Sequence, residues 1–264
     1  MATHDDLAGA VAIVTGAGSG IGRATARALD ARGVLVFAAD IDLSAAEASL
    51  QDLSVRARAF ALDVRSPQDW AGLANTIRED HGRLDILVNN AGVMINAPFL
   101  ETSLETFRAQ NAINVEGVFL GMQTAIPLML PRKPEGPSAS IVNVSSVYGQ
   151  VAGASFSGYS ASKGAVRALT KAVAREFADK GVRVNSIHPG PTATNLGAGW
   201  APPRDAEGRL LTPEEALRTW TDLIPMGRLG AAEEMADAIT FLCSAASRYM
   251  TGSELVVDGG YIAV

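Results

Sequence analysis

Apolar runs alternate with segments of helical spacing along the whole chain. Runs typical of strands covered on both faces lie at 10–15, 34–40, 56–64, 84–92, 140–146, 181–190 and 253–260. Helical spacing is found at 23–33 and 43–53, from Ser66, from Ser103, at 112–130 and 156–180, from Thr212 and at 232–244. This alternation predicts an α/β fold: a doubly wound, Rossmann-like domain whose seven-stranded parallel sheet carries helices on both faces.

Local signals place several helix ends. Ser66 followed by Pro67 predicts a helix start, with a capping hydroxyl and a proline in the first turn. Thr212 and Glu215 predict a capping box that opens a short helix. Gly33 is a candidate C-cap for the helix that precedes it.

We expect one domain over 1–264, because no linker divides the chain and no repeat is present. The segment 192–222 contains "GAGWAPPRDAEG" and is expected to be a substrate lid or loop. A loop of that length inside a compact domain is usually either a lid or disordered.

Composition and charge narrow the function classes. The formal net charge is -6, which argues against a nucleic-acid binder, since such proteins usually present a basic face. Cys243 is the only cysteine, which excludes an intrachain disulfide and fits a reducing compartment. The start has no signal-peptide pattern, and the apolar stretch 115–131 is interrupted by Glu116 and Pro127 and is interpreted as too short to span a bilayer. We expect a soluble cytoplasmic protein with no membrane segment.

The stretch "TGAGSGIG" at 15–22 lies between the first strand and the first helix. Gly16 permits a tight turn, Gly20 lets the backbone approach a diphosphate, and Gly22 lets the helix pack closely. The N–H groups of the helix start would then face the anion. Glycines often only make turns, but the strand-turn-helix context favours a dinucleotide site.

Asp40 ends the second strand, where an acid that binds the adenosine ribose is expected. A carboxylate there accepts hydrogen bonds from ribose hydroxyls and repels a 2′-phosphate. Ile41 follows it, and Ser19 in the turn is not basic, so the sequence favours NAD over NADP. The alternative is that Asp40 is only a solvated strand end.

Ordered motifs along almost the whole chain resemble those of the short-chain dehydrogenase/reductase family. They are "TGAGSGIG" (15–22), "LDV" (62–64), "NNAG" (89–92), "NVEG" (114–117), "VSS" (144–146), "YSASK" (159–163) and "HPGPTAT" (188–194). The resemblance implies catalytic roles for Asn114, Ser146, Tyr159 and Lys163. It implies cofactor contacts for Gly16, Ser19, Gly20, Ile21, Gly22, Asp40, Asp63, Val64, Asn90, Ala91, Gly92, Tyr159, Lys163, Pro189, Gly190, Thr192 and Thr194.

The family spacing of thirteen residues before the tyrosine selects Ser146 over Ser145, which would point the other way on the strand. By the same resemblance, Lys163 holds the nicotinamide ribose and Asn114 holds a water that links Lys163 to solvent. The resemblance of the end "DGGYIAV" to family C-termini at subunit interfaces implies a homotetramer or a dimer.

Tyr159 and Lys163 lie one helical turn apart, on one face. A phenol with a pKa near 10 is a poor base, a nearby cation favours the phenolate, and an oxidised nicotinamide ring would add a second positive charge. We therefore expect a lowered pKa for Tyr159, which would act as the acid/base while Ser146 donates a hydrogen bond to the substrate oxygen.

These residues predict an NAD-dependent oxidoreductase that interconverts a secondary alcohol and a ketone. Two alternatives stay open: an NADP-dependent β-ketoacyl-thioester reductase, and a non-catalytic cofactor-binding interaction protein. Apolar residues expected along the substrate walls weakly favour an apolar or cyclic carbonyl; they are Val93, Met94, Val151, Leu196 and Trp200. His188 is expected to be structural, and no residue cluster has metal-ligand spacing, so no metal is predicted.

Overall fold

A computed structural model describes residues 7–51, 53, 57–130, 138–197 and 209–263 of the chain. The strands in this part are β1 (Val11–Thr15), β2 (Leu35–Asp40), β3 (Arg58–Ala61), β4 (Ile86–Asn89), β5 (Ala139–Val144), β6 (Val182–Pro189) and β7 (Glu254–Val257). The helices are α1 (Gly20–Asp30), α2 (Leu43–Ser49), α3 (Pro67–His81), α4 (Leu104–Asn111), α5 (Gly117–Met129), α6 (Ser157–Phe177), α7 (Pro213–Thr221) and α8 (Ala232–Cys243).

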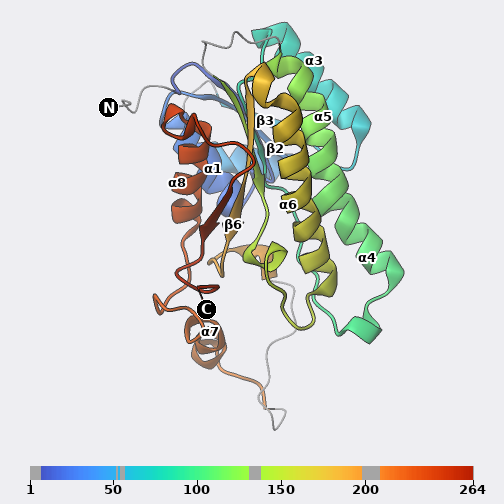
Figure 1. Ribbon diagram of the computed structural model, residues 1–264, viewed down its shortest axis with the longest axis vertical. Helices are drawn as coiled ribbons and strands as arrows, with labels where there is room; N and C mark the ends of the chain where they lie inside the picture. The colour runs from blue at the N-terminus through green and yellow to red at the C-terminus, as the bar shows by residue number, and fades with distance from the viewer. Residues whose placement is uncertain (1–6, 52, 54–56, 131–137, 198–208, 264) are drawn as a thin grey trace.

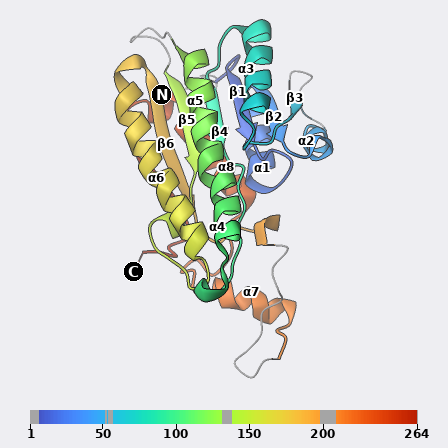
Figure 2. The same cartoon turned by 90° about the vertical axis from the view of Figure 1, so that its right-hand side faces the viewer.

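The strands form one parallel sheet in the order β3-β2-β1-β4-β5-β6-β7. Helices α3, α5 and α6 cover one face, and α1 and α8 cover the other (Figures 1 and 2). This arrangement confirms the predicted doubly wound fold. The strand order reverses between β1 and β4, and in such sheets ligands bind at the carboxyl ends of the strands beside that reversal.

The central strands are apolar because both faces are covered. Every residue of β1 is buried, and so is every residue of β4, β5 and β6. One apolar core lies between the sheet and α3, α5 and α6, and a second lies between the sheet and α1 and α8. The sheet is therefore a rigid platform from which the loops at its carboxyl edge project.

Helix ends follow the predicted signals at two places. The Ser66 hydroxyl accepts a hydrogen bond from the Asp69 N–H, with Pro67 in the first turn of α3. Thr212 and Glu215 form the predicted capping box at α7. The prediction for Gly33 was wrong, because α1 ends at Asp30 with Ala31 as its C-cap, and Gly33 (φ +76°) lies in the turn beyond.

Helices α4 and α5 are one continuous helical segment rather than the two separate helices expected from the sequence. A π-turn, Ala112–Glu116, joins them and contains the buried Asn114 (Figure 2). The segment Leu104–Met129 is 26 residues long, so the expectation that the apolar stretch was too short to span a bilayer was wrong on length. Half of its apolar window is buried inside the protein, as is typical of a core helix, and Pro127 is accommodated within α5.

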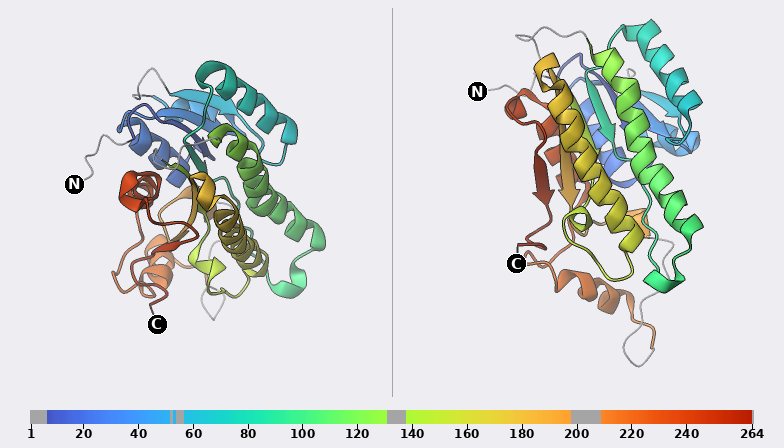
Figure 3. Two further views of the ribbon diagram at one scale, coloured as in Figure 1. Left: turned by 45° about the horizontal axis from the view of Figure 1, so that its top comes forward. Right: turned by 45° about the vertical axis from the view of Figure 1, so that its right-hand side comes forward.

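Helix α7 lies apart from the sheet, beyond the carboxyl ends of the strands (Figures 1 and 3). It belongs to the segment 192–222 that was expected to form a substrate lid or loop. Residues 198–208, which include Trp200, lie outside the described residues. The lid therefore remains a prediction.

A buried polar ladder ties the middle of the sheet to α6. Asn89 on β4 donates to the Asn143 side chain at 2.9 Å, and Asn143 donates to the Thr170 hydroxyl at 2.9 Å. All three residues are buried. Amide side chains at this depth stabilise the protein only as long as each has its partner.

Asn143→Ala should lower the free energy of unfolding by about 2–4 kcal/mol, because it leaves Asn89 and Thr170 as buried polar groups without this partner. Urea denaturation followed by circular dichroism measures the change. A loss below about 0.5 kcal/mol would show that the ladder does not stabilise the sheet.

Candidate active site

A cleft of about 1290 Å³ opens at the carboxyl ends of the strands and is lined by the loops that follow β1 to β6. Every residue predicted to contact the cofactor lines this cleft except Gly22. Of the residues predicted to be catalytic, Ser146, Tyr159 and Lys163 line it, and Asn114 is buried behind it. Residues from distant parts of the sequence thus converge on one site.

The glycine-rich turn is shaped by close contacts that only glycine allows. Gly16 has φ +62°, and a Cβ there would lie 2.9 Å from the Ala91 Cα. A Cβ on Gly22 would lie 2.1 Å from the Gly16 carbonyl oxygen, so Gly22 packs the start of α1 against the turn rather than lining the cleft. Ser19 is the N-cap residue of α1, but its side chain does not cap the helix. The first-turn N–H groups are therefore available to an anion, and this turn fits a dinucleotide diphosphate.

Asp40 is held at the end of β2 by two backbone donors. Its carboxylate accepts hydrogen bonds from the Gly18 N–H at 2.8 Å and the Asp42 N–H at 3.0 Å. A Cβ on Gly18 would lie 2.9 Å from an Asp40 carboxylate oxygen, so Gly18 is required for this contact and was missed by the sequence reasoning. The carboxylate keeps further lone pairs for ribose hydroxyls.

Arg65 brings a cation to the cleft lining that the sequence reasoning did not consider. Its guanidinium pairs with Asp63, with 2.6 Å between the nearest nitrogen and oxygen, and hydrogen bonds from Arg65 lower the pKa of Asp63. Because the guanidinium of Arg65 is paired with Asp63, it does not offset the negative charge that Asp40 places at the end of β2.

The end of β5 and helix α6 carry the candidate catalytic side chains. The Ser146 Oγ accepts the Tyr148 N–H at 3.1 Å, and its hydroxyl acts on the Tyr159 phenol to lower the phenol's pKa. Ser145 points away, as predicted, and its hydroxyl donates to the Lys163 carbonyl oxygen at 2.9 Å. The two serines therefore have different environments, and Ser146 is the one beside Tyr159.

Lys163 reaches back to the strand. Its Nζ donates to the Val144 carbonyl oxygen at 2.8 Å and lies 5.7 Å from the centroid of the Tyr159 ring. Both side chains are buried, and burial acts on each in the direction of its neutral form. Burial lowers the pKa of Lys163 to about 8.

The protein groups alone do not lower the pKa of Tyr159; the lowering predicted for Lys163 and an oxidised nicotinamide acting together stays a prediction. Burial raises the pKa of Tyr159 to about 12, and the Ser146 side chain opposes that rise only in part. The neutral phenol is thus the form that this site favours, and a further positive charge is needed to make it a base.

Asn114 is committed to structural hydrogen bonds. Its Oδ1 accepts the Val93 N–H at 2.9 Å, and its Nδ2 donates to the Val93 carbonyl oxygen and the Ser162 hydroxyl, at 2.9 and 3.0 Å. Both amide hydrogens are used, so a water could bind only Oδ1 or the main chain. A Cβ on Gly92 would lie 3.2 Å from the Asn114 Oδ1 and 3.4 Å from the Lys163 Nζ, which places the three residues together.

His188 is structural in its contacts, in agreement with the prediction. It is fully buried, and its Nδ1 lies 3.0 Å from the Ser146 carbonyl oxygen, while its Nε2 lies 2.9 Å from the Ser186 hydroxyl. A carbonyl only accepts, so Nδ1 carries the hydrogen. His188 therefore supports the main chain of Ser146.

The substrate side of the cleft is partly as predicted. Val93, Met94 and Leu196 line it, whereas Val151 is not among the lining residues. Sequence reasoning missed Trp220 and Tyr261, which also line the cleft. Trp220 lies on α7, which comes after β6, and Tyr261 follows β7.

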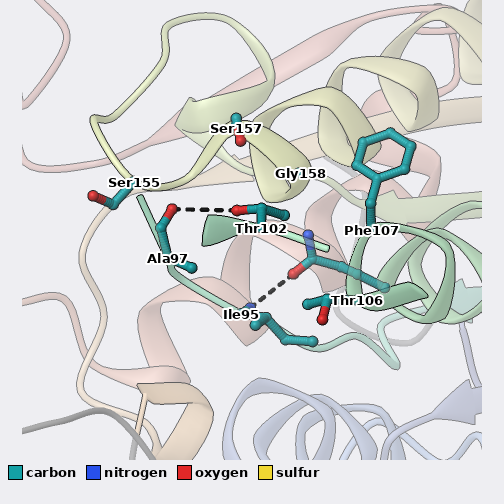
Figure 4. A pocket seen from close by; sticks show the side chains of 9 residues that line it. Ile95, Ala97, Thr102, Thr106, Phe107, Ser155, Ser157 and Gly158 are labelled. Carbon is teal, nitrogen blue, oxygen red and sulfur yellow. Dashed lines mark hydrogen bonds between the residues drawn. The ribbon is translucent and has the colours of Figure 1, made fainter. Parts of the chain in front are cut away.

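The cleft continues at Ile95, Ala97 and Ser155 into a small cavity of about 10 Å³ (Figure 4). The Gln110 Oε1 accepts the Ile95 N–H at 2.7 Å, and the Ala97 carbonyl oxygen accepts a long hydrogen bond from Thr102 at 3.5 Å. A space of this size holds at most about one water molecule. It is therefore no substrate site, and these contacts fix the loop after β4 to the α4 region.

Among the described residues, no group of three or more His, Cys, Asp and Glu side chains is placed to hold a metal ion. Cys243, which is buried, has its pKa raised to about 12 by burial. Within the part of the chain described, therefore, neither a metal site nor the Cys243 thiol offers an alternative reactive centre.

Comparisons with known proteins agree with this geometry. A family model described as enoyl-(acyl carrier protein) reductase matches residues 16–262. The chain is 38% identical to cyclohexanol dehydrogenase of Acinetobacter sp. (strain SE19), covering 95% of this chain and 94% of that protein. It is 39% identical to D-threitol dehydrogenase of Mycolicibacterium smegmatis, covering 97% and 94%.

It is also 35% identical to 3-alpha-(or 20-beta)-hydroxysteroid dehydrogenase of Mycobacterium bovis, covering 97% of this chain and 91% of that protein. A crystal structure described as ribose-5-phosphate isomerase from Brucella melitensis 16M superimposes with a TM-score of 0.86 at 33% identity. The superposition covers 97% of this chain and 93% of that one, so the similarity extends over the whole sheet and its helices.

Lys163→Met should change how stability depends on pH. The folded protein releases the Lys163 proton near pH 8, whereas the unfolded chain keeps it to about 10.5, so the unfolded state binds more protons between these values. Wild-type stability should therefore rise from pH 7.5 to 9.5, relative to the variant, by roughly 1–3 kcal/mol. Urea denaturation of both proteins at the two pH values measures this, and parallel pH dependences would contradict the buried, depressed titration.

Proposed function

The chain belongs to the short-chain dehydrogenase/reductase family, and from this premise we propose that it is an NAD-dependent dehydrogenase that interconverts a secondary alcohol and the corresponding ketone. The observation that carries the proposal is the convergence of Ser146, Tyr159 and Lys163 on the cleft, with the Lys163 Nζ 5.7 Å from the centroid of the phenol ring. These three groups supply what the reaction needs at the substrate oxygen.

A nicotinamide dinucleotide, when bound, supplies the hydride donor or acceptor. The turn from Gly16 to Gly22 would hold its diphosphate, Asp40 its adenosine ribose, and Lys163 its nicotinamide ribose. The remaining cofactor-contacting residues predicted from the sequence lie around the same cleft. Their placement supports this binding mode.

In ketone reduction, Tyr159 donates its proton to the carbonyl oxygen as that oxygen gains negative charge. A phenol with a pKa of about 12 is fully protonated at neutral pH, so it is ready to act as the acid. In alcohol oxidation the same phenol must first lose its proton, and the positive charge of an oxidised nicotinamide favours this, as does the Lys163 ammonium.

Ser146 orients the substrate oxygen. Because its Oγ accepts the Tyr148 N–H, its own hydrogen is directed to the phenol or to a substrate oxygen. This donor would stabilise the negative charge that develops on that oxygen. Lys163 is fixed by the Val144 carbonyl, and Asn114 holds the main chain at Val93 beside it.

Relatives with ring alcohols in their names support a substrate of that kind. They include cyclohexanol dehydrogenase, cyclopentanol dehydrogenase of Comamonas testosteroni and the hydroxysteroid dehydrogenase. The apolar side chains of Met94, Leu196 and Trp220 in the cleft fit a carbocycle. We propose a cyclic secondary alcohol as the substrate class.

Two alternative functions have less support than the proposed dehydrogenase activity. The description of the family model names an acyl-carrier-protein substrate, which supports a thioester reductase, but the acidic Asp40 disfavours the NADP that such a role normally uses. A non-catalytic binding protein would not need the assembled Ser146, Tyr159 and Lys163.

We further propose a cytoplasmic homotetramer or dimer, supported by exposed apolar residues around α4 such as Phe99, Leu100 and Leu104.

Tyr159→Phe should reduce kcat at least about 1000-fold for oxidation of cyclohexanol with NAD, because the acid/base group is gone, while the Kd for NADH changes less than about threefold. Wild-type kcat/KM for this oxidation should rise from pH 6 to 9, since the phenolate is the rarer form below a pKa of about 12. Absorbance of the reduced nicotinamide measures both.

The matched control is Tyr249→Phe, which removes the hydroxyl of a fully exposed tyrosine and should leave kcat unchanged. A Tyr159→Phe enzyme that keeps more than about a tenth of wild-type kcat would refute the role given to Tyr159.

Asp40→Asn should lower kcat/KM for NAD about 10- to 100-fold, since charged hydrogen bonds of about 1.5–3 kcal/mol are weakened, and should raise it for NADP. Steady-state kinetics with each cofactor measures the ratio. Asp42→Asn is the control, because asparagine also caps a helix start and Asp42 is not among the cleft-lining residues. A wild-type preference for NADP would overturn the cofactor assignment.

A further inference from the structure

Two tyrosine hydroxyls meet at the wall of the cleft although they are far apart in the sequence. The Tyr148 and Tyr261 hydroxyl oxygens are 3.4 Å apart, and both residues line the cleft that contains Tyr159. The ring centroids of Tyr148 and Tyr159 are 6.4 Å apart with an edge-on angle of 77°. A small molecule whose reacting oxygen contacts Tyr159 is thus near the tyrosine pair.

Tyr148 is held rigidly beside the reacting groups. Its N–H donates to Ser146, and its ring packs on Phe156 with 5.2 Å between centroids. A Cβ on Gly153 would approach the Tyr148 hydroxyl oxygen to 2.8 Å, so a glycine is needed where the chain passes over it. The position of this phenol is therefore set by its contacts with Ser146, Phe156 and Gly153.

Tyr261 is placed by a tight turn wound around Asp258. The Asp258 carboxylate accepts the Gly260 and Ile262 N–H groups at 2.8 and 2.9 Å, and Gly259 and Gly260 have φ +64° and +90°. A Cβ on Gly190 would lie 2.6 Å from the Asp258 Cβ, so this turn packs against the loop after β6. The C-terminal turn is built to present Tyr261 to the cleft.

The tyrosine pair has one hydroxyl hydrogen that is not used in its mutual hydrogen bond. Two phenols carry two hydroxyl hydrogens, and their mutual bond uses one, so the second is available to a third group. Burial raises the pKa of Tyr148, which keeps this phenol protonated throughout the working range. Met94, Ile95 and Trp220 contribute apolar surface to the same cleft. A hydroxyl donor in such surroundings selects for ligands with an oxygen at the matching position, because a ligand that lacks this oxygen leaves the donor without a partner.

We propose that Tyr148 and Tyr261 together bind a second oxygen of the substrate, so that the preferred substrates are ring alcohols carrying another hydroxyl or carbonyl group. This inference rests on the proposed function and names its substrate more closely. The reacting hydroxyl contacts Tyr159 and Ser146, and the second oxygen accepts the spare hydrogen of the tyrosine pair. Tyr148 and Tyr261 are specificity residues and take no part in proton transfer.

The test compares cyclohexanol with the cis and trans isomers of cyclohexane-1,2-, 1,3- and 1,4-diol, using NAD and the wild-type enzyme. At least one diol should have a kcat/KM about tenfold above that of cyclohexanol, beyond the twofold that a second oxidisable hydroxyl provides by number alone. Tyr148→Phe and Tyr261→Phe should each lower the ratio of diol to cyclohexanol kcat/KM about tenfold. The double variant should lower it little further, because the pair acts as one unit.

Tyr249→Phe is the matched control and should leave the ratio unchanged, since Tyr249 is fully exposed. The inference is overturned when no diol exceeds cyclohexanol, or when both single variants keep the wild-type ratio. Turnover of none of these alcohols would overturn the proposed function itself. Turnover of cyclohexanol with an unchanged ratio refutes only the role of the tyrosine pair.

Discussion

Lys163 joins helix α6 to the end of strand β5 through both its side chain and its main chain. Its Nζ donates to the Val144 carbonyl oxygen, and its own carbonyl oxygen accepts the Ser145 hydroxyl. A Cβ on Gly149 would lie 2.8 Å from that carbonyl oxygen, so the turn after β5 packs against the helix without room for a side chain. Because Ser146 follows Ser145 and Tyr159 lies one turn before Lys163, this junction sets the geometry of the site.

Burial at the junction has opposite effects on its two titratable groups. It lowers the pKa of Lys163 to about 8 and raises that of Tyr159 to about 12, so each is held toward its neutral form. A site of this kind donates a proton readily and becomes basic only when positive charge is added. In the proposed reaction, alcohol oxidation is the direction that needs a base, and there the oxidised nicotinamide would supply the positive charge. In ketone reduction the nicotinamide is reduced, and its ring is neutral.

The fold and most of the candidate site could be predicted from the sequence because their signals are local. Strand runs, the turn at Gly16 and the spacing from Tyr159 to Lys163 each occupy a few consecutive residues, and the structure places them as expected in one cleft. The pKa of Tyr159 could not be predicted, since it depends on how deeply α6 is packed. Tyr261 was missed because sheet order brings the turn after β7 to the cleft, whereas Arg65 was missed although it directly follows the predicted Asp63 and Val64. The π-turn at Asn114 also lacks a local pattern, and it commits the Asn114 amide to Val93 and Ser162.

In the proposed reaction, this junction couples hydride transfer from a secondary carbinol carbon to proton removal by Tyr159. Incubation of the wild-type enzyme with NAD and cyclohexanol deuterated at the carbinol carbon is the decisive test of this coupling. We expect equal amounts of cyclohexanone and reduced cofactor, with the deuterium found on the nicotinamide ring. Ketone formation without label on the cofactor, or no reduction of NAD by any cyclic secondary alcohol, would contradict it.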